Sequence, residues 1–94
     1  MPKFVKASHI LVKTEDEALK LKQEIEGGKD FAQAAMEVSL CPSGQNGGDL
    51  GYFTRGQMVK EFEDAAFSME KGQVSNPIKT QFGYHLIYLT DTQD

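Results

Sequence analysis

The segment Cys41-Pro-Ser-Gly-Gln-Asn-Gly-Gly-Asp-Leu-Gly-Tyr-Phe53 holds four of the nine glycines in this chain, its single cysteine and one of its three prolines. Glycine and proline disfavour helices, so the segment predicts a loop and excludes a regular α-helix. Glycine also permits positive φ angles and close approach of two backbones. Because the segment begins with a thiol and ends in Leu50, Tyr52 and Phe53, we expect a functional site here.

The composition of the 94 residues indicates one folded domain that spans residues 1–94. Hydrophobic residues make up 39% of the chain and charged residues 26%, which excludes a disordered polymer. No apolar run reaches the ~18 residues that span a bilayer, and residues 1–6 lack the apolar segment of a secretory signal. A single cysteine cannot form an internal disulfide, which is typical of reducing compartments. We therefore expect a cytoplasmic monomer without an integral membrane segment.

The net charge of −4 argues against non-specific binding to nucleic acid, which depends on neutralising phosphates. One reading of the basic residues is a patch that contacts an anionic surface or an acidic partner. The other reading places the lysines on solvated faces, and the acidic residues interleaved with them favour it. Six of the ten basic residues precede Asp30: Lys3, Lys6, Lys13, Lys20, Lys22 and Lys29.

Two segments with alternating side chains contain the only histidines of the chain. A period of two places His9 on the same strand face as Leu11, and His85 on the same face as Ile87. The turn Gln81-Phe82-Gly83 joins the last two strands into an antiparallel hairpin. We expect strands over residues 7–12, 52–54, 76–80 and 84–90.

Helix-start signals separate these strands. Thr14 and Glu17 have the spacing of a capping box, and Gly27-Gly28 ends the helix that follows. Asp30 caps a second helix, with apolar residues at the spacing of a buried face, and residues 59–67 predict a third helix. This order of elements fits an α+β domain in which helices cover a small sheet.

The two histidines and Cys41 are the candidates for chemistry. A single histidine in a strand is more often a hydrogen-bonded core residue than a catalyst, but two in so small a domain favour a shared site. Cys41 beside a histidine would form a nucleophilic dyad; the alternative is an inert, partly buried thiol. One cysteine and two widely separated histidines lack the spacing of a zinc site, and the glycine-rich segment matches no phosphate-binding motif.

Several large apolar residues lie in the predicted loops and helix starts around the glycine-rich segment. Some of them belong to the core, but this placement is also typical of a concave apolar binding pocket. They are Leu50, Phe53, Met58, Phe62 and Phe82.

Four groups of residues, in order along the chain from about Lys6 to Leu89, resemble the parvulin family of peptidyl-prolyl cis/trans isomerases. The resemblance implies a four-stranded antiparallel sheet surrounded by about four helices, with no cofactor and no metal. The groups are Ser8-His9-Ile10-Leu11, Cys41-Pro-Ser-Gly44 with Gly47-Gly48-Asp49-Leu50-Gly51, Met58 with Phe62, and Thr80-Gln-Phe-Gly-Tyr-His85.

The resemblance also implies roles for individual residues. His9 and His85 correspond to the paired histidines of the family's site, Thr80 to the threonine that hydrogen-bonds to them, and Cys41 to a position held by cysteine or aspartate. The residues implied to bind the substrate proline are Leu50, Met58 and Phe62, with Phe82 and Phe53 beside them.

The implied function is isomerisation of X–Pro bonds in unfolded or flexible polypeptides, without a covalent intermediate and with Cys41 tuning the electrostatics. The link Lys13-Thr-Glu-Asp-Glu17 is acidic where phosphoserine-directed parvulins carry a basic cluster, so we do not expect phosphoserine preference. Two alternatives remain open at this point: a chaperone or scaffold module that binds proline segments with little turnover, and a thiol hydrolase built on Cys41.

Overall fold

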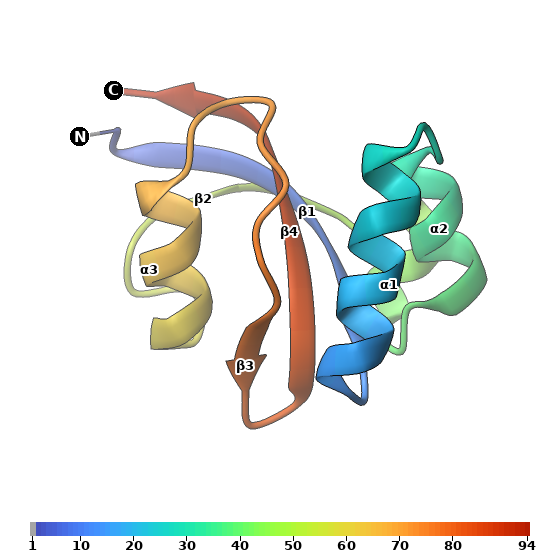
Figure 1. Ribbon diagram of the computed structural model, residues 1–94. Helices are drawn as coiled ribbons and strands as arrows, with labels where there is room; N and C mark the ends of the chain where they lie inside the picture. The colour runs from blue at the N-terminus through green and yellow to red at the C-terminus, as the bar shows by residue number, and fades with distance from the viewer. Residues whose placement is uncertain (1) are drawn as a thin grey trace.

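The computed structural model describes residues 2–94, which form a four-stranded antiparallel sheet with strand order β2-β1-β4-β3. Figure 1 shows α3 on one side of this sheet and α1 with α2 on the other. The elements are β1 (Phe4–Val12), α1 (Glu15–Glu26), α2 (Phe31–Val38), the 3-10 helix η1 (Pro42–Asn46), β2 (Asp49–Phe53), α3 (Lys60–Ser68), β3 (Ile78–Thr80) and β4 (Gly83–Gln93). The expected α+β class and antiparallel sheet are confirmed. The expected helices, about four in number, are three α-helices and this 3-10 helix within residues 2–94.

The central strands β1 and β4 extend beyond the segments that their apolar patterns predict. They pair from Phe4 opposite Gln93 to Val12 opposite Tyr84. The last residues of β4, Asp91-Thr-Gln93, carry no hydrophobic signal and are strand because β1 supplies hydrogen-bond partners for them.

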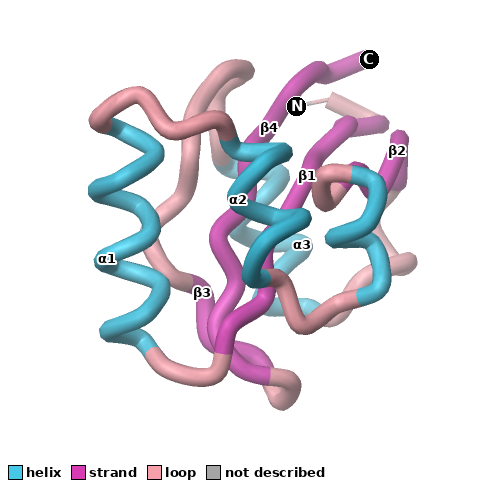
Figure 2. The backbone as a smooth tube through the Cα atoms, turned by 90° about the vertical axis from the view of Figure 1, so that its right-hand side faces the viewer, coloured by secondary structure: helices cyan, strands magenta, loops and turns pink. Residues whose placement is uncertain are grey.

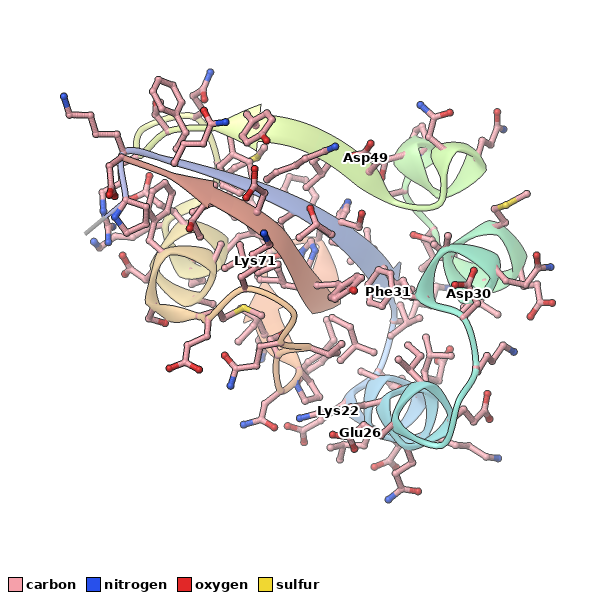
Figure 3. All side chains as sticks on the ribbon, turned by 90° about the horizontal axis from the view of Figure 1, so that it is seen from above. Lys22, Glu26, Asp30, Phe31, Asp49 and Lys71 are labelled. Atoms are coloured by element: carbon pink, nitrogen blue, oxygen red, sulfur yellow. The ribbon has the colours of Figure 1, made fainter. Side chains whose placement is uncertain are left out.

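The core divides into two clusters, one on each face of the sheet, as the period of two predicts. Figure 2 shows the tube of the central strands passing between the helices. In Figure 3, Phe31 points from α2 toward the sheet, where its ring lies 5.4 Å from that of Tyr88. The α3-side cluster is Val5, Ala7, Phe53, Phe62, Ala66, Phe67, Ile87 and Leu89; the other is Ile10, Val12, Ala18, Leu21, Phe31, Ala34, Ala35 and Leu86.

The helix starts follow the expected capping residues. Thr14 Oγ1 accepts a hydrogen bond from the Glu17 N–H at 3.2 Å, and Asp30 Oδ2 accepts one from the Gln33 N–H at 3.0 Å. Instead of bonding back to the Thr14 backbone, the Glu17 carboxylate accepts the Thr14 hydroxyl at 3.1 Å. Within residues 2–94, none of the helices is both long and apolar enough to cross a bilayer.

The segment between α3 and β3 runs along β4 before the short strand begins. Val74 pairs opposite Tyr88, and Ser75 Oγ accepts a hydrogen bond from the Ile87 N–H at 3.0 Å. This side-chain oxygen replaces a backbone carbonyl, so the free edge of β4 is covered although β3 itself spans only Ile78–Thr80.

Candidate active site

A cavity of about 490 Å³ opens between the sheet, α3 and the glycine-rich segment. It brings together most of the residues expected at the site, from positions 9 to 85 of the chain. The described residues that line it are His9, Leu11, Leu40, Cys41, Pro42, Leu50, Gln57, Met58, Val59, Phe62, Phe82 and His85.

The paired strands β1 and β4 place the two histidines side by side, although 76 positions separate them in the sequence. Leu11 lies opposite His85 in the strand register, so His9 and His85 are diagonal neighbours on one face. Their Nδ1 atoms are 3.0 Å apart, and their rings lie nearly parallel at a centroid distance of 5.2 Å. The ring of Phe62 meets both histidine rings edge-on, at 5.5 Å and 5.4 Å.

Two hydroxyl groups complete the hydrogen bonding of the histidine pair. Thr80 Oγ1 lies 2.7 Å from His85 Nε2 and accepts a bond from the Phe82 N–H at 3.2 Å. At the other end, Ser43 Oγ lies 3.2 Å from His9 Nε2. All four ring nitrogens therefore have partners, and no buried side-chain nitrogen or oxygen among the described residues lacks one.

The position of Thr80 assigns the protons in this chain of hydrogen bonds. Its oxygen accepts the Phe82 N–H, and its own buried hydroxyl proton needs an acceptor, for which His85 Nε2 at 2.7 Å is the partner in reach. His85 then carries its own proton on Nδ1 and donates it to Nδ1 of His9. His9 in turn holds a proton on Nε2 and donates it to Ser43, whose half-buried hydroxyl keeps its own proton free to donate.

Both histidines are neutral at physiological pH. Burial, followed by the proximity of His85, lowers the pKa of His9 to about 4. Burial also lowers the pKa of His85. A charged imidazolium would lose hydration here without gaining an anionic partner, so the neutral pair is the stable state.

Two glycines fix the backbone beside the histidines. Gly48, at φ +84°, accepts the His9 N–H on its carbonyl at 2.9 Å, and a Cβ added there would lie 2.3 Å from the His9 carbonyl oxygen. Gly83, at φ +140°, approaches the end of β1 so closely that its Cβ would lie 2.6 Å from the Val12 oxygen. The close backbone approach expected of the glycine-rich segment occurs at Gly48.

Cys41 lies at the cavity wall with its side chain partly exposed. Its backbone N–H bonds to Ser39 Oγ at 3.4 Å, at the start of η1. Because the nitrogens of both histidines bond to each other, Ser43 and Thr80, neither ring has a free nitrogen to deprotonate the thiol. The arrangement does not support the thiol hydrolase alternative.

The expected proline-binding residues occupy different depths of the site. Leu50, Met58 and Phe62 line the cavity, and Phe82, with 61% of its surface exposed, stands at the rim. Phe53 does not line it: the side chain is 3% exposed and packs in the core against Phe62 and Phe67. Its place in the alternating β2 strand turns it inward, whereas Leu50 lies where the strand meets the loop.

Sequence reasoning did not identify Ser43, which bonds to His9, or the lining residues Leu11, Leu40, Pro42, Gln57 and Val59. A signal for Ser43 existed in the accounting of hydrogen bonds. Two paired histidines have four ring nitrogens, of which their mutual bond uses two and Thr80 one, so one further polar partner is required.

Apart from the Cys41 thiol, the cavity lining is uncharged at neutral pH, because both histidines are neutral and the other lining residues carry no ionisable acid or base. Apolar side chains form its floor and rim, and polar hydrogen-bonding groups form one wall. Such a site can hold a small apolar ring beside fixed dipoles. Within residues 2–94, no group of three or more His, Cys, Asp or Glu side chains could hold a metal ion.

Comparison with known protein families finds a match over most of the chain. Residues 6–91 match the family described as "Rotamase: PPIC-type PPIASE domain". The chain is 55% identical over 91 residues to the foldase protein PrsA 1 of Bacillus cereus and 53% identical over 91 residues to PrsA of a Geobacillus species. These matches cover 96% of this chain but 32% and 33% of the relatives, so the chain spans about a third of their length.

The same fold occurs in solved structures of longer chains and of chains about as long as this one. The peptidylprolyl isomerase PrsA of Bacillus anthracis superposes with a TM-score of 0.96 at 44% identity, over 99% of this chain and 43% of that one. The parvuline of Nitrosopumilus maritimus superposes with a TM-score of 0.88 at 46% identity, over 97% of this chain and 99% of that one.

Proposed function

Because this chain belongs to the PPIC-type peptidyl-prolyl isomerase family, the parvulins, we propose that it catalyses cis/trans isomerisation of X–Pro bonds in unfolded or flexible polypeptides. The observation that carries this proposal is the apolar cavity whose wall is a fully hydrogen-bonded, neutral histidine pair. The cavity has the size and chemistry for a proline ring, and its polar wall offers fixed dipoles to the adjoining amide.

Rotation about an X–Pro bond requires no bond to be made or broken. The barrier of ~18–20 kcal/mol arises from amide resonance, and unaided isomerisation takes ~10–100 s. A protein accelerates the rotation when it binds the twisted amide better than either planar isomer. In this chain the apolar floor at Leu50, Met58 and Phe62 holds the ring while the preceding carbonyl turns.

The polar wall supports the twisted state through groups that are already oriented. Twisting changes the charge on the amide oxygen and makes its nitrogen a better acceptor, and preorganised donors respond to both changes without reorganising. The Cys41 thiol is a donor that lines the cavity with the histidines, whereas the Ser43 hydroxyl, which keeps its proton after accepting from His9, supports the pair without lining the cavity. Cys41 contributes electrostatically and forms no covalent intermediate.

The substrate is not expected to require phosphorylation. The cavity lining contains no lysine or arginine, and α1, which follows β1, begins with Glu15, Asp16 and Glu17. A phosphate therefore finds no cationic partner in the cavity.

The test is an isomerase assay on peptides that vary the residue before proline and include phosphoserine. We expect acceleration of cis-to-trans conversion with unmodified peptides and no gain from phosphoserine. Peptide binding with a background rate would instead identify a binding module.

We also propose that residues 1–94 form one domain that acts as a cytoplasmic monomer. The near-complete overlap with the Nitrosopumilus maritimus parvuline supports an independently folding unit, and the free Cys41 thiol suits a reducing compartment. The interleaved acids favour solvated lysines over contact of Lys3, Lys6 and neighbouring lysines with an anionic surface. Light scattering tests whether the chain is a monomer, and cell fractionation tests its location. Sedimentation with anionic vesicles tests whether the lysines bind an anionic surface.

A further inference from the structure

The loop of residues 54–59, between β2 and α3, carries one side of the cavity. Three consecutive residues of this loop, Gln57, Met58 and Val59, line it. The loop has no regular secondary structure; the Thr54 N–H bonds to Gln57 Oε1 at 2.7 Å within it, and at its end the Val59 carbonyl accepts the Glu63 N–H at 3.0 Å. Its remaining contacts are with side chains in the first turns of α3.

Glu63 makes the central contact. Its carboxylate accepts hydrogen bonds from the Gly56 N–H and from Arg55 Nη1, the latter at 3.2 Å. The Glu63 side chain is only 12% exposed, unlike the other acids at the start of α3. Charge-assisted bonds to a shielded carboxylate are stronger than bonds between neutral groups.

Arg55 is itself fixed from two further directions. Its Nη1 lies 3.3 Å from Asp64 Oδ1, and its guanidinium lies over the ring of Phe67 at 4.8 Å from the centroid. Phe67 belongs to the core cluster on this face of the sheet. The loop is therefore attached to a rigid part of the molecule through Arg55 and Glu63 together.

We infer that Glu63 is a positioning residue for the cavity, because it connects the loop that carries Met58 to the helix turn that carries Phe62. Phe62 precedes Glu63 in α3, and Phe62 and Met58 both line the cavity. Glu63 thus sets the spacing between Phe62, which is fixed in α3, and Met58, which lies in the loop. This inference rests on the proposed function, since it assigns the spacing to recognition of the proline ring.

Loss of the Glu63 carboxylate removes the recorded partner of the Gly56 N–H and one of the two carboxylates that hold Arg55. Met58 then samples positions in which the cavity no longer fits the ring. A pocket that holds the ring in both planar and twisted states contributes uniform binding, so its loss appears in KM more than in kcat.

The experiment compares Glu63→Ala and Glu63→Gln with the matched control Glu61→Gln. Glu61 lies in the same first turn of α3 but is exposed, so its replacement removes the same charge from the same helix end. Readouts are kcat and KM on a proline peptide, the melting temperature, and the NMR signal of the Met58 methyl group with and without peptide. Glu63→Gln keeps an acceptor for the Gly56 N–H, so it still tests the inference if Glu63→Ala does not fold.

We expect Glu63→Ala to raise KM about tenfold, the size of one charge-assisted hydrogen bond, with kcat changed less than about twofold. In Glu63→Ala the Met58 signal should shift at temperatures well below melting. The KM and the Met58 signal of Glu63→Gln should lie between those of Glu63→Ala and the parent chain, and those of Glu61→Gln should equal the parent's. An unshifted Met58 signal with a KM equal to that of Glu61→Gln would overturn the inference. If the parent chain fails to isomerise, the proposed function fails, while peptide titration of the Met58 signal still tests the role of Glu63.

Discussion

The two sides of the cavity differ in how their side chains are held. On one side, which we call the histidine wall, His9, His85, Thr80 and Ser43 form a continuous chain of hydrogen bonds between two central strands. On the other, the apolar wall of Leu40, Leu50, Met58 and Phe82, Leu40 is 56% and Phe82 61% exposed.

This difference separates stability from substrate binding. The histidine wall is buried on the two central strands of the sheet, so its hydrogen bonds stabilise the folded state. The apolar side chains at the rim bury little surface until a substrate covers them, so they contribute mainly to binding. The predictions below test this separation, beginning with the largest expected effect.

The largest effect is expected from His85→Ala. It removes a buried ring and leaves Thr80 and His9 without their shared partner, which should cost about 4 kcal/mol of unfolding free energy. Chemical denaturation measures this cost, and activity should fall with it. An unchanged midpoint would show that the histidine wall does not stabilise the fold. Thr80→Val, which keeps the ring, is the control and should cost less.

The second prediction concerns pH. In the unfolded chain both histidines take up protons below about pH 6.5, whereas in the folded chain His9 does so only at about pH 4. The unfolded state therefore binds more protons between these values, so stability falls as pH falls through this window, by up to about 3 kcal/mol for His9.

Denaturation at several pH values measures that slope, and NMR titration of the two histidine rings assigns it, since the chain contains no others. The histidine wall would not be the neutral, desolvated network described above if both rings titrated near 6.5. Loss of stability confined to pH below about 4 would point to carboxylates instead.

The third prediction moves to the apolar wall. Met58→Ala should lower kcat/KM about tenfold, or ~1.4 kcal/mol, because the cavity loses contact with the proline ring. Its melting temperature should change much less than that of His85→Ala, since Met58 is only partly buried in a loop. Equal losses of stability in the two variants would remove the distinction between the walls.

The smallest effect is expected where the walls meet, at Cys41. Cys41→Ala should reduce kcat/KM by about threefold, because the thiol acts through electrostatics and no bond forms to it. Mass spectrometry after incubation with peptide should find no adduct. Complete loss of activity or an acyl adduct would instead support a nucleophilic thiol.

Features that depend on neighbours in the sequence could be predicted from it. Thr14 and Asp30 cap their helices through contacts three residues away, and the alternation within each strand places His9 on the face of Leu11 and His85 on the face of Ile87. These interactions span a single turn or a strand period, so the residue types are sufficient. The resemblance to parvulins added the grouping of His9, His85, Cys41 and Thr80.

Only the tertiary structure decided which distant groups meet. The Ser43–His9 bond spans 34 positions, and the strand register, not the local pattern, brings His85 to His9. Packing also decided that Phe53 is buried while Phe82 is exposed, although both are phenylalanines within two residues of a glycine. The physical reason is that a hydrogen bond or a buried ring depends on where two segments lie in space, and their relative position is fixed when the sheet and its helices pack together.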